Sequence, residues 1–115
     1  MDLETLRGIC FKQKATTEDI KWENHLCFNV GGKMYLVTNP DAVPISASIK
    51  VNDSNFDALT QREGIIPAPY LARYKWIYLD DIGRLSVQEW ETLISEAYQL
   101  IFDKLPSKIK REILS

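Results

Sequence analysis

The sequence predicts one α+β domain over residues 1–115, with a twisted antiparallel sheet of about five strands covered on one face by an N-terminal helix and a long C-terminal helix. Two observations lead to this fold class. Alternating apolar runs flank a Gly-Gly pair at residues 31–32, which is typical of a β-hairpin. Between residues 87 and 105, apolar residues recur at three- and four-residue steps, which is typical of an amphipathic helix.

Composition and charge exclude several classes of protein. A hydrophobic content of 45% and a charged content of 26% are those of a globular domain, and no segment approaches the roughly 20 apolar residues of a membrane span. The N-terminus carries acidic residues where a secretion signal has basic ones, so we expect a cytoplasmic protein without membrane contact. The net charge of -2 means that any nucleic-acid site requires basic residues gathered on one face.

A helix and a short strand are expected before the hairpin. Residues 2–13 place apolar side chains on one helical face, and Asp2 is suited to cap the free backbone N–H groups. Within the charged stretch 14–24, Ile20 and Trp22 lie two positions apart, which predicts a brief edge strand.

Residues 25–37, HLCFNVGGKMYLV, form the predicted hairpin. Glycine adopts positive φ without steric penalty, so Gly31 and Gly32 supply a two-residue turn and set the strand pairing. The expected pairs are Val30 with Lys33, Phe28 with Tyr35, and Leu26 with Val37. These residues are expected on one face, and the other face is expected to carry Cys27, Asn29, Met34 and Leu36.

Another strand and a short helix are expected next. Pro44 opens a strand over residues 45–51, whose alternation predicts one buried face and one solvent-facing face. Residues 52–64 begin with helix-capping types and end on Gly64, which predicts a short helix.

Residues 65–79, IIPAPYLARYKWIYL, return the chain to the sheet. Two X-Pro steps make the first part a stiff, extended connector. Tyr74, Trp76 and Tyr78 then alternate with residues of the opposite face, which predicts the last strand. We interpret these three aromatic residues as part of the core, because large apolar side chains are mostly buried.

A long helix closes the predicted fold. Ser86 and Glu89 have the spacing of a capping box at its start. Its apolar stripe comprises Val87, Trp90, Leu93, Ile94, Ala97, Tyr98, Ile101 and Leu105. Pro106 interrupts the helix, and the last residues, SKIKREILS, restart as a basic turn or short helix.

Four stretches of the sequence carry a family resemblance. They are FNVGGKMYLV (28–37), ISASIKV (45–51), GIIPAPYLARYKWIYL (64–79) and AYQLIFDKLPSKIK (97–110). In combination they resemble the MmcQ/YjbR family of small bacterial proteins over nearly the whole chain. The resemblance implies a cytosolic α+β fold of the frataxin/CyaY-like kind, in which helices cover one face of a curved antiparallel sheet.

The resemblance also implies a partner. Members of the family are commonly labelled DNA-binding, partly by likeness to phage double wing transcription-factor domains, so double-stranded DNA is the implied ligand. The residues expected to contact it are Lys33, Lys50, Arg73 and Lys75 at phosphates and Tyr70 at a base or sugar. The densest basic cluster is Lys104, Lys108, Lys110 and Arg111, although cations at a helix C-terminus also explain it. The alternative is a protein-interaction module that uses the connector around Tyr70 and the basic C-terminus.

Catalytic and metal-binding patterns are lacking, so we expect no enzymatic activity, no cofactor and no metal site. His25 is the only histidine, and Cys10 and Cys27 lie in apolar patterns typical of packing thiols in a reducing compartment. Asp80 and Asp81 precede a glycine, which is typical of a turn. The acidic residues of the first 23 positions are interrupted by Lys and Arg, which is too dilute for a hard cation.

Overall fold

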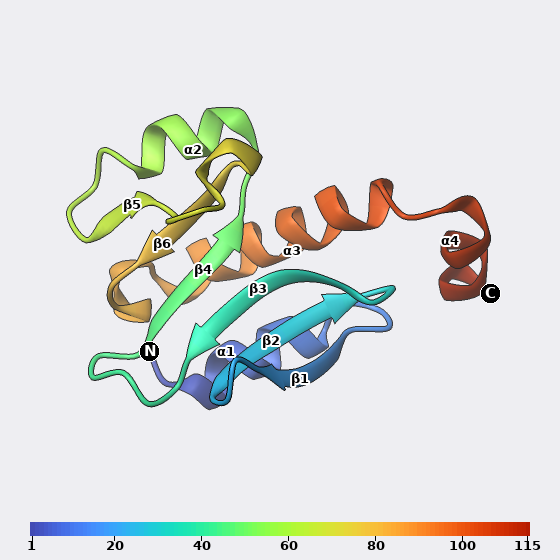
Figure 1. Ribbon diagram of the computed structural model, residues 1–115, viewed down its shortest axis with the longest axis horizontal. Helices are drawn as coiled ribbons and strands as arrows, with labels where there is room; N and C mark the ends of the chain where they lie inside the picture. The colour runs from blue at the N-terminus through green and yellow to red at the C-terminus, as the bar shows by residue number, and fades with distance from the viewer.

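The computed structural model describes residues 1–115 as a six-stranded antiparallel sheet with four α-helices (Figure 1). The strands are β1 Thr17–Lys21, β2 His25–Val30, β3 Lys33–Asn39, β4 Ser46–Lys50, β5 Ile65–Pro67 and β6 Trp76–Leu79, and their order in the sheet is β1-β2-β3-β4-β6-β5. The helices are α1 Leu3–Phe11, α2 Asp53–Leu59, α3 Val87–Asp103 and α4 Ser107–Leu114, with 3-10 turns at Ala72–Tyr74 and Ile82–Arg84. None of the helices has the length and apolar character needed to cross a membrane.

Helices α1 and α3 cover one face of the sheet, as predicted (Figure 1). A core of 22 buried residues lies between them and the strands, and at its centre the Trp90 indole donates a 2.7 Å hydrogen bond to the Ile82 carbonyl. The predicted start of α3 is confirmed, since Ser86 and Glu89 form a complete capping box. Val87, predicted to belong to the apolar stripe, is instead 46% exposed, because it is the first residue of the helix and lies outside the core.

The turn of the β2–β3 hairpin is the predicted one, and it contacts the end of α3. Gly31 and Gly32 both have positive φ, of 57° and 78°. A Cβ added at Gly31 would stand 2.7 Å from Cδ1 of Leu105, whereas a Cβ at Gly32 would meet nothing within 4 Å. Gly31 therefore serves both the turn conformation and a close approach to the helix.

A β-bulge changes the register of the hairpin beyond its turn. The residue opposite Phe28 is Leu36 rather than the predicted Tyr35. The extra residue on β3 puts Tyr35 and Leu36 together in the core under the helices and moves Val37 to the opposite face. The Tyr35 hydroxyl reaches the Cys10 carbonyl at 3.3 Å, which accounts for its orientation. The observed pairs after the bulge are Phe28 with Leu36, Cys27 with Val37, and Leu26 with Thr38.

The connector after α2 contains a strand that sequence patterns did not predict. Ile65–Pro67 pairs with β6, so the sheet has six strands instead of about five. The following residues, Ala68 and Leu71, pack on the face opposite the helices, against Trp76 and its neighbours. On β4, Ser46 was predicted to face solvent but is buried.

The last strand begins at Trp76 rather than Tyr74. Lys75 has a φ of 63°, a left-handed conformation that breaks the expected alternation. Trp76 is 5% exposed, as predicted for a core residue, and Tyr78 is half-buried against the same cluster. Tyr74 is 52% exposed, so its predicted place in the core is wrong.

An ion pair joins α1 to the edge strand β1. The Arg7 guanidinium donates to both carboxylate oxygens of Glu18, at 3.0 and 2.5 Å, and also contacts Glu4 at 3.0 Å. The hydrogen bonds from Arg7 hold the pKa of Glu18 below its usual range. The Glu4 side chain is far more exposed than that of Glu18.

Substituting alanine at the two turn glycines tests the close approach to α3. We expect Gly32→Ala to cost ~1–2 kcal/mol of unfolding free energy, because an L-residue is strained at positive φ. Gly31→Ala carries the same strain and also displaces Leu105, so its loss should be larger by ~1–3 kcal/mol. Urea unfolding of the two variants measures the difference, and equal losses would contradict the contact.

Acid titration of stability tests the ion pair at Glu18. A carboxylate with a lowered folded-state pKa stabilises the fold above its unfolded-state pKa of about 4.3, and this contribution disappears as the pH falls through the folded-state value. Glu18→Gln should therefore be less stable than the parent protein at pH 7, and the difference should shrink progressively as the pH falls below about 4.3. Glu4→Gln is the matched control and should differ less at pH 7. A stability difference for Glu18→Gln that does not change with pH would contradict the assignment.

Candidate nucleic-acid interface

The sheet opens between β3 and β4 at the end next to the Gly31–Gly32 turn. The two strands pair only between Leu36, opposite Ile49, and Asn39, opposite Ser46. Beyond that point β3 stays with β2, while β4 stays with β6 and ends at Lys50 opposite Trp76. A pocket of about 420 Å³ occupies the opening, and the end of α3 forms one wall of it.

Three lysines from three separate elements line this pocket: Lys33, Lys50 and Lys104. Lys33 is the first residue after the glycine turn and is exposed. Lys50 ends β4 and is half-buried, and Lys104 is the exposed C-cap of α3. The packing of the turn against Leu105 brings the first and the last of them to the same opening.

None of the three lysines has an acidic partner within ion-pair distance. The protein has five such pairs, and all of them lie elsewhere: Arg7–Glu4, Arg7–Glu18, Lys12–Glu91, Arg62–Glu89 and Arg84–Asp80. The pocket is thus a local concentration of uncompensated positive charge in a protein whose net charge is -2. Such a concentration is the electrostatic feature that attracts anions.

The Lys50 ammonium shows the effect of this concentration. Its Nζ donates a hydrogen bond to the backbone carbonyl of Tyr74. Burial lowers the pKa of Lys50, and the positive charges of Lys104 and Lys75 lower it further, while Asp53 opposes them. Both effects disfavour the charged form in the free protein.

The remaining wall of the pocket is apolar and aromatic. It consists of Met34, Tyr74, Trp76, Ile101 and Leu105. The Arg73 guanidinium lies over the Tyr74 ring at 4.8 Å from its centroid, and the Lys75 ammonium lies over the Phe56 ring at 4.7 Å. These two cations therefore flank the opening without lining it.

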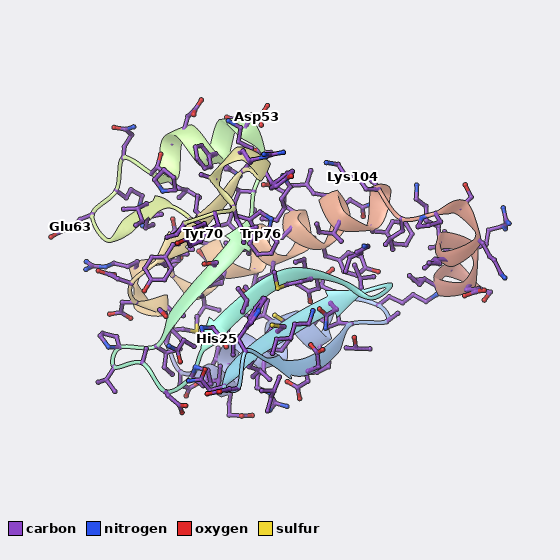
Figure 2. The ribbon with its side chains drawn as sticks, viewed as in Figure 1. His25, Asp53, Glu63, Tyr70, Trp76 and Lys104 are labelled. Carbon is purple, nitrogen blue, oxygen red and sulfur yellow. The ribbon has the colours of Figure 1, made fainter.

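A second hollow adjoins the first. It has a volume of about 460 Å³, and it shares Lys50 and Lys104 with the pocket. Its other residues include Asp53 at the start of α2 and Leu100 of α3. Figure 2 labels Lys104 on α3, Asp53 on α2 and Trp76 at the start of β6. The two lysines thus have an open space on either side.

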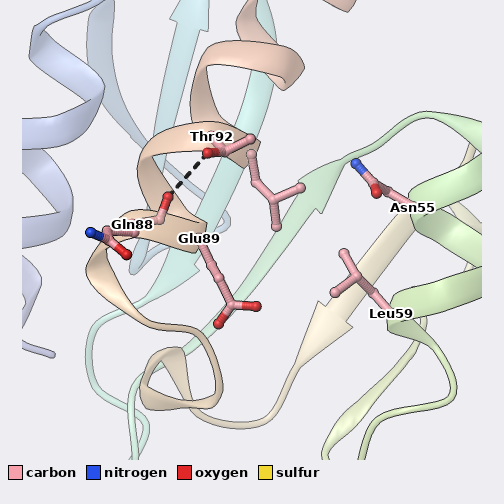
Figure 3. Close-up of a pocket in the computed structure, with 6 residues that line it drawn as sticks. Asn55, Leu59, Gln88, Glu89 and Thr92 are labelled. Atoms are coloured by element: carbon pink, nitrogen blue, oxygen red, sulfur yellow. Dashed lines mark hydrogen bonds between the residues drawn. The ribbon is translucent and has the colours of Figure 1, made fainter.

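A separate pocket of about 300 Å³ lies between α2 and α3 (Figure 3). Three of its four polar side chains, all but that of Gln88, are already bound within the protein. Glu89 caps α3 and pairs with Arg62 at 2.6 Å, Asn55 donates to Glu96 at 3.0 Å, and Thr92 donates to the Gln88 carbonyl at 3.2 Å. No charged group is left over to hold a ligand there, so we assign this pocket no function.

The cysteines and the histidine are packed into the fold. Cys10 and Cys27 are free and buried, and burial raises the pKa of the Cys10 thiol to about 12, which disfavours the nucleophilic thiolate. The His25 ring lies edge-on to Trp22 at 6.0 Å, and its Nδ1 is buried without a hydrogen-bond partner. No group of three or more His, Cys, Asp or Glu side chains is arranged to hold a metal ion.

The structure brings together part of the site expected from the sequence. Lys33 and Lys50 line the pocket, and Arg73 and Lys75 flank it through their contacts with Tyr74 and Phe56. Tyr70 lies outside it, 98% exposed, with a φ of 66°.

Two residues of the pocket were missed by the sequence analysis. Lys104 was grouped with the basic C-terminus, and Tyr74 was assigned to the core. The one signal for Lys104 was its position directly before Leu105, the last residue of the apolar stripe. The sequence pattern does not indicate which strand residues lie opposite the end of α3.

Comparison with known proteins identifies the fold. The YjbR family model matches residues 12–100. A crystal structure of Deinococcus radiodurans protein DR2400, with the family-model domain DUF419, is similar with a TM-score of 0.85 and 22% identity, covering 97% of this chain and 87% of that one. A Pseudomonas syringae protein is similar with a TM-score of 0.70 and 20% identity, covering 88% and 99%. No match is found among curated proteins.

Replacing Lys50 tests whether it is present for binding rather than for stability. Methionine keeps a similar length and the apolar contacts of the stem while removing the charge, so Lys50→Met should be as stable as the parent protein or more stable. Lys33→Met, an exposed position, is the control and should change the unfolding free energy by less than ~0.5 kcal/mol. Urea unfolding measures both. A loss above ~1 kcal/mol in Lys50→Met alone would identify Lys50 as a structural residue.

Proposed function

Since the chain belongs to the YjbR family, we propose that it is a non-enzymatic DNA-binding protein of that family, whose interface is the lysine-lined opening between β3 and β4. The observation that carries the proposal is the convergence of Lys33, Lys50 and Lys104 on one pocket without acidic partners. We also propose a cytoplasmic location, where a DNA-binding protein of this kind would meet its DNA.

The energetics of the three lysines support an anionic ligand. In the free protein the charges of Lys50 and Lys104 repel each other, and Lys50 is also partly removed from water. A phosphate bound at the opening would reverse both penalties, because it supplies the missing negative charge and accepts hydrogen bonds from ammonium groups. An arrangement that is unfavourable alone and favourable with an anion is expected of a binding site.

Further basic residues extend the charged surface on both sides of the pocket. Arg73 and Lys75 flank it on the connector side. On the other side, α4 follows directly after Leu105, and Ile109 of α4 lies against the glycine turn, so this helix is held next to Lys33. The α4 residues that add charge are Lys108, Lys110 and Arg111. A row of cations longer than one pocket suits a phosphate backbone.

A protein partner is the alternative, and the exposed connector favours it. Tyr70 is 98% exposed and Ile66 is 50% exposed, and large apolar side chains in such positions are enriched at protein interfaces. The two alternatives separate in a DNA titration. Absence of salt-sensitive binding to duplex DNA at micromolar protein would remove the DNA proposal and leave the connector as the surface to pursue.

Salt-dependent titration of a labelled DNA duplex by fluorescence anisotropy tests the proposal. We expect log K to fall linearly with log salt, with a slope of about -0.9 for each phosphate contact. Lys33→Ala, Lys50→Met and Lys104→Ala should each weaken binding and reduce the slope by about one contact.

The control for this titration is Lys21→Ala. It removes the same charge at the end of β1, opposite His25, at the far end of the β2–β3 hairpin from the glycine turn. The slope of this variant should equal that of the parent protein. Equal losses in Lys21→Ala and the pocket variants would mean that overall charge, and not this opening, governs binding.

A further inference from the structure

The pocket is more than a row of cations, because most of its wall is apolar. Five of its eight lining residues are hydrophobic, and the lysines lie around them. Phosphate contacts alone do not need an apolar recess, since a phosphate has no surface that gains from leaving water. We propose that the recess receives the base of one unpaired nucleotide, while Lys33, Lys50 and Lys104 hold the adjoining phosphates; this inference rests on the proposed DNA binding.

The size of the recess suits a ligand of nucleotide size. At about 420 Å³ it falls within the range of roughly 300–1,000 Å³ that is usual for small-molecule pockets. A base that is paired and stacked in a duplex presents only an edge in a groove, so it has to leave the stack to enter such a space. Unpaired nucleotides at bulges and strand ends have no pairing to break and enter at less cost.

Tyr74 is the residue best placed to stack on the base. It lines the recess, and it is 52% exposed, although the other aromatic side chain there, Trp76, is buried. Its backbone carbonyl accepts a hydrogen bond from the Lys50 ammonium, so this cation is held beside Tyr74. A stacking ring next to a fixed cation is the arrangement that binds a base together with its phosphate.

The recess has little means of telling one base from another. Its lining contains no Asn, Gln, Asp, Glu, Ser or Thr, so its polar side-chain groups are only the lysine ammoniums, the Tyr74 hydroxyl and the Trp76 indole N–H. Stacking is tolerant of sequence because every base has a π-face. The site therefore distinguishes unpaired nucleotides from paired ones and does not select a particular base.

Three DNA duplexes of the same length and sequence test the inference by anisotropy at one salt concentration. The first is fully paired, the second carries one unpaired adenine, and the third carries one unpaired abasic residue at the same position. The duplex with the unpaired adenine should bind about tenfold more tightly than the paired one, which is the scale of one stacked base. The abasic duplex should bind like the paired one, because it bends similarly but offers no base.

Two tyrosine variants connect this preference to the recess. Tyr74→Leu should lose the preference for the unpaired adenine, so that its affinities for the paired and the adenine duplex become equal. Tyr70→Leu is the matched control: Tyr70 lies four residues earlier and outside the pocket, and its variant should keep the preference. Both positions are exposed, so both variants should fold.

The possible failures are distinguishable. Equal binding of the paired and adenine duplexes, or of the adenine and abasic duplexes, would overturn the inference and leave DNA binding intact. Loss of the preference in Tyr70→Leu but not in Tyr74→Leu would overturn the assignment to this recess. Failure to bind any of the three duplexes would overturn the proposed function itself.

Discussion

Leu105 lies against the bare backbone of Gly31, so close that a Cβ on the glycine would stand 2.7 Å from the leucine Cδ1. This contact joins the tip of the β2–β3 hairpin to the end of α3, two points 74 residues apart in the chain. Because α3 also packs across β2, β3 and β4, its direction is set by the sheet. The position of the turn relative to Lys104, and with it one side of the pocket, depends on that close approach.

The opening in the sheet arises where β3 and β4 separate from each other. β3 continues past its last pair with β4 to reach the glycine turn, and β4 ends at Lys50 to enter α2. Strands that separate expose apolar side chains between them, and here the end of α3 and the first residues of β6 cover part of this surface. The result is a recess with an apolar floor and lysines around it, where burial and like charge both act against the ammonium of Lys50.

Much of the fold could be predicted from local signals in the sequence. The Gly31–Gly32 turn, the capping box of Ser86 and Glu89 and the apolar stripe from Trp90 onward each depend on residues a few positions apart, and each was confirmed. The bulge at Tyr35 and Leu36 was not predictable from alternation. The apolar pattern is compatible with Phe28 opposite either residue, and only the packing of the core selects Leu36. The short strand Ile65–Pro67 was missed since prolines in that segment indicated only a connector.

The sequence by itself determined the fold class and the positions of the long helix and the glycine turn, because these depend on short-range periodicity, capping and glycine conformation. The resemblance of four stretches of the sequence indicated the family, which the family model matches. Of the candidate site, the sequence yielded Lys33 and Lys50 as separate cations but could not bring them together. Only the tertiary structure decided that Lys104 joins them, that Tyr74 lines the recess and that Tyr70 lies outside it. The physical reason is that a site built from a turn, a strand end and a helix end depends on contacts across the whole chain, and those contacts form only when the core packs.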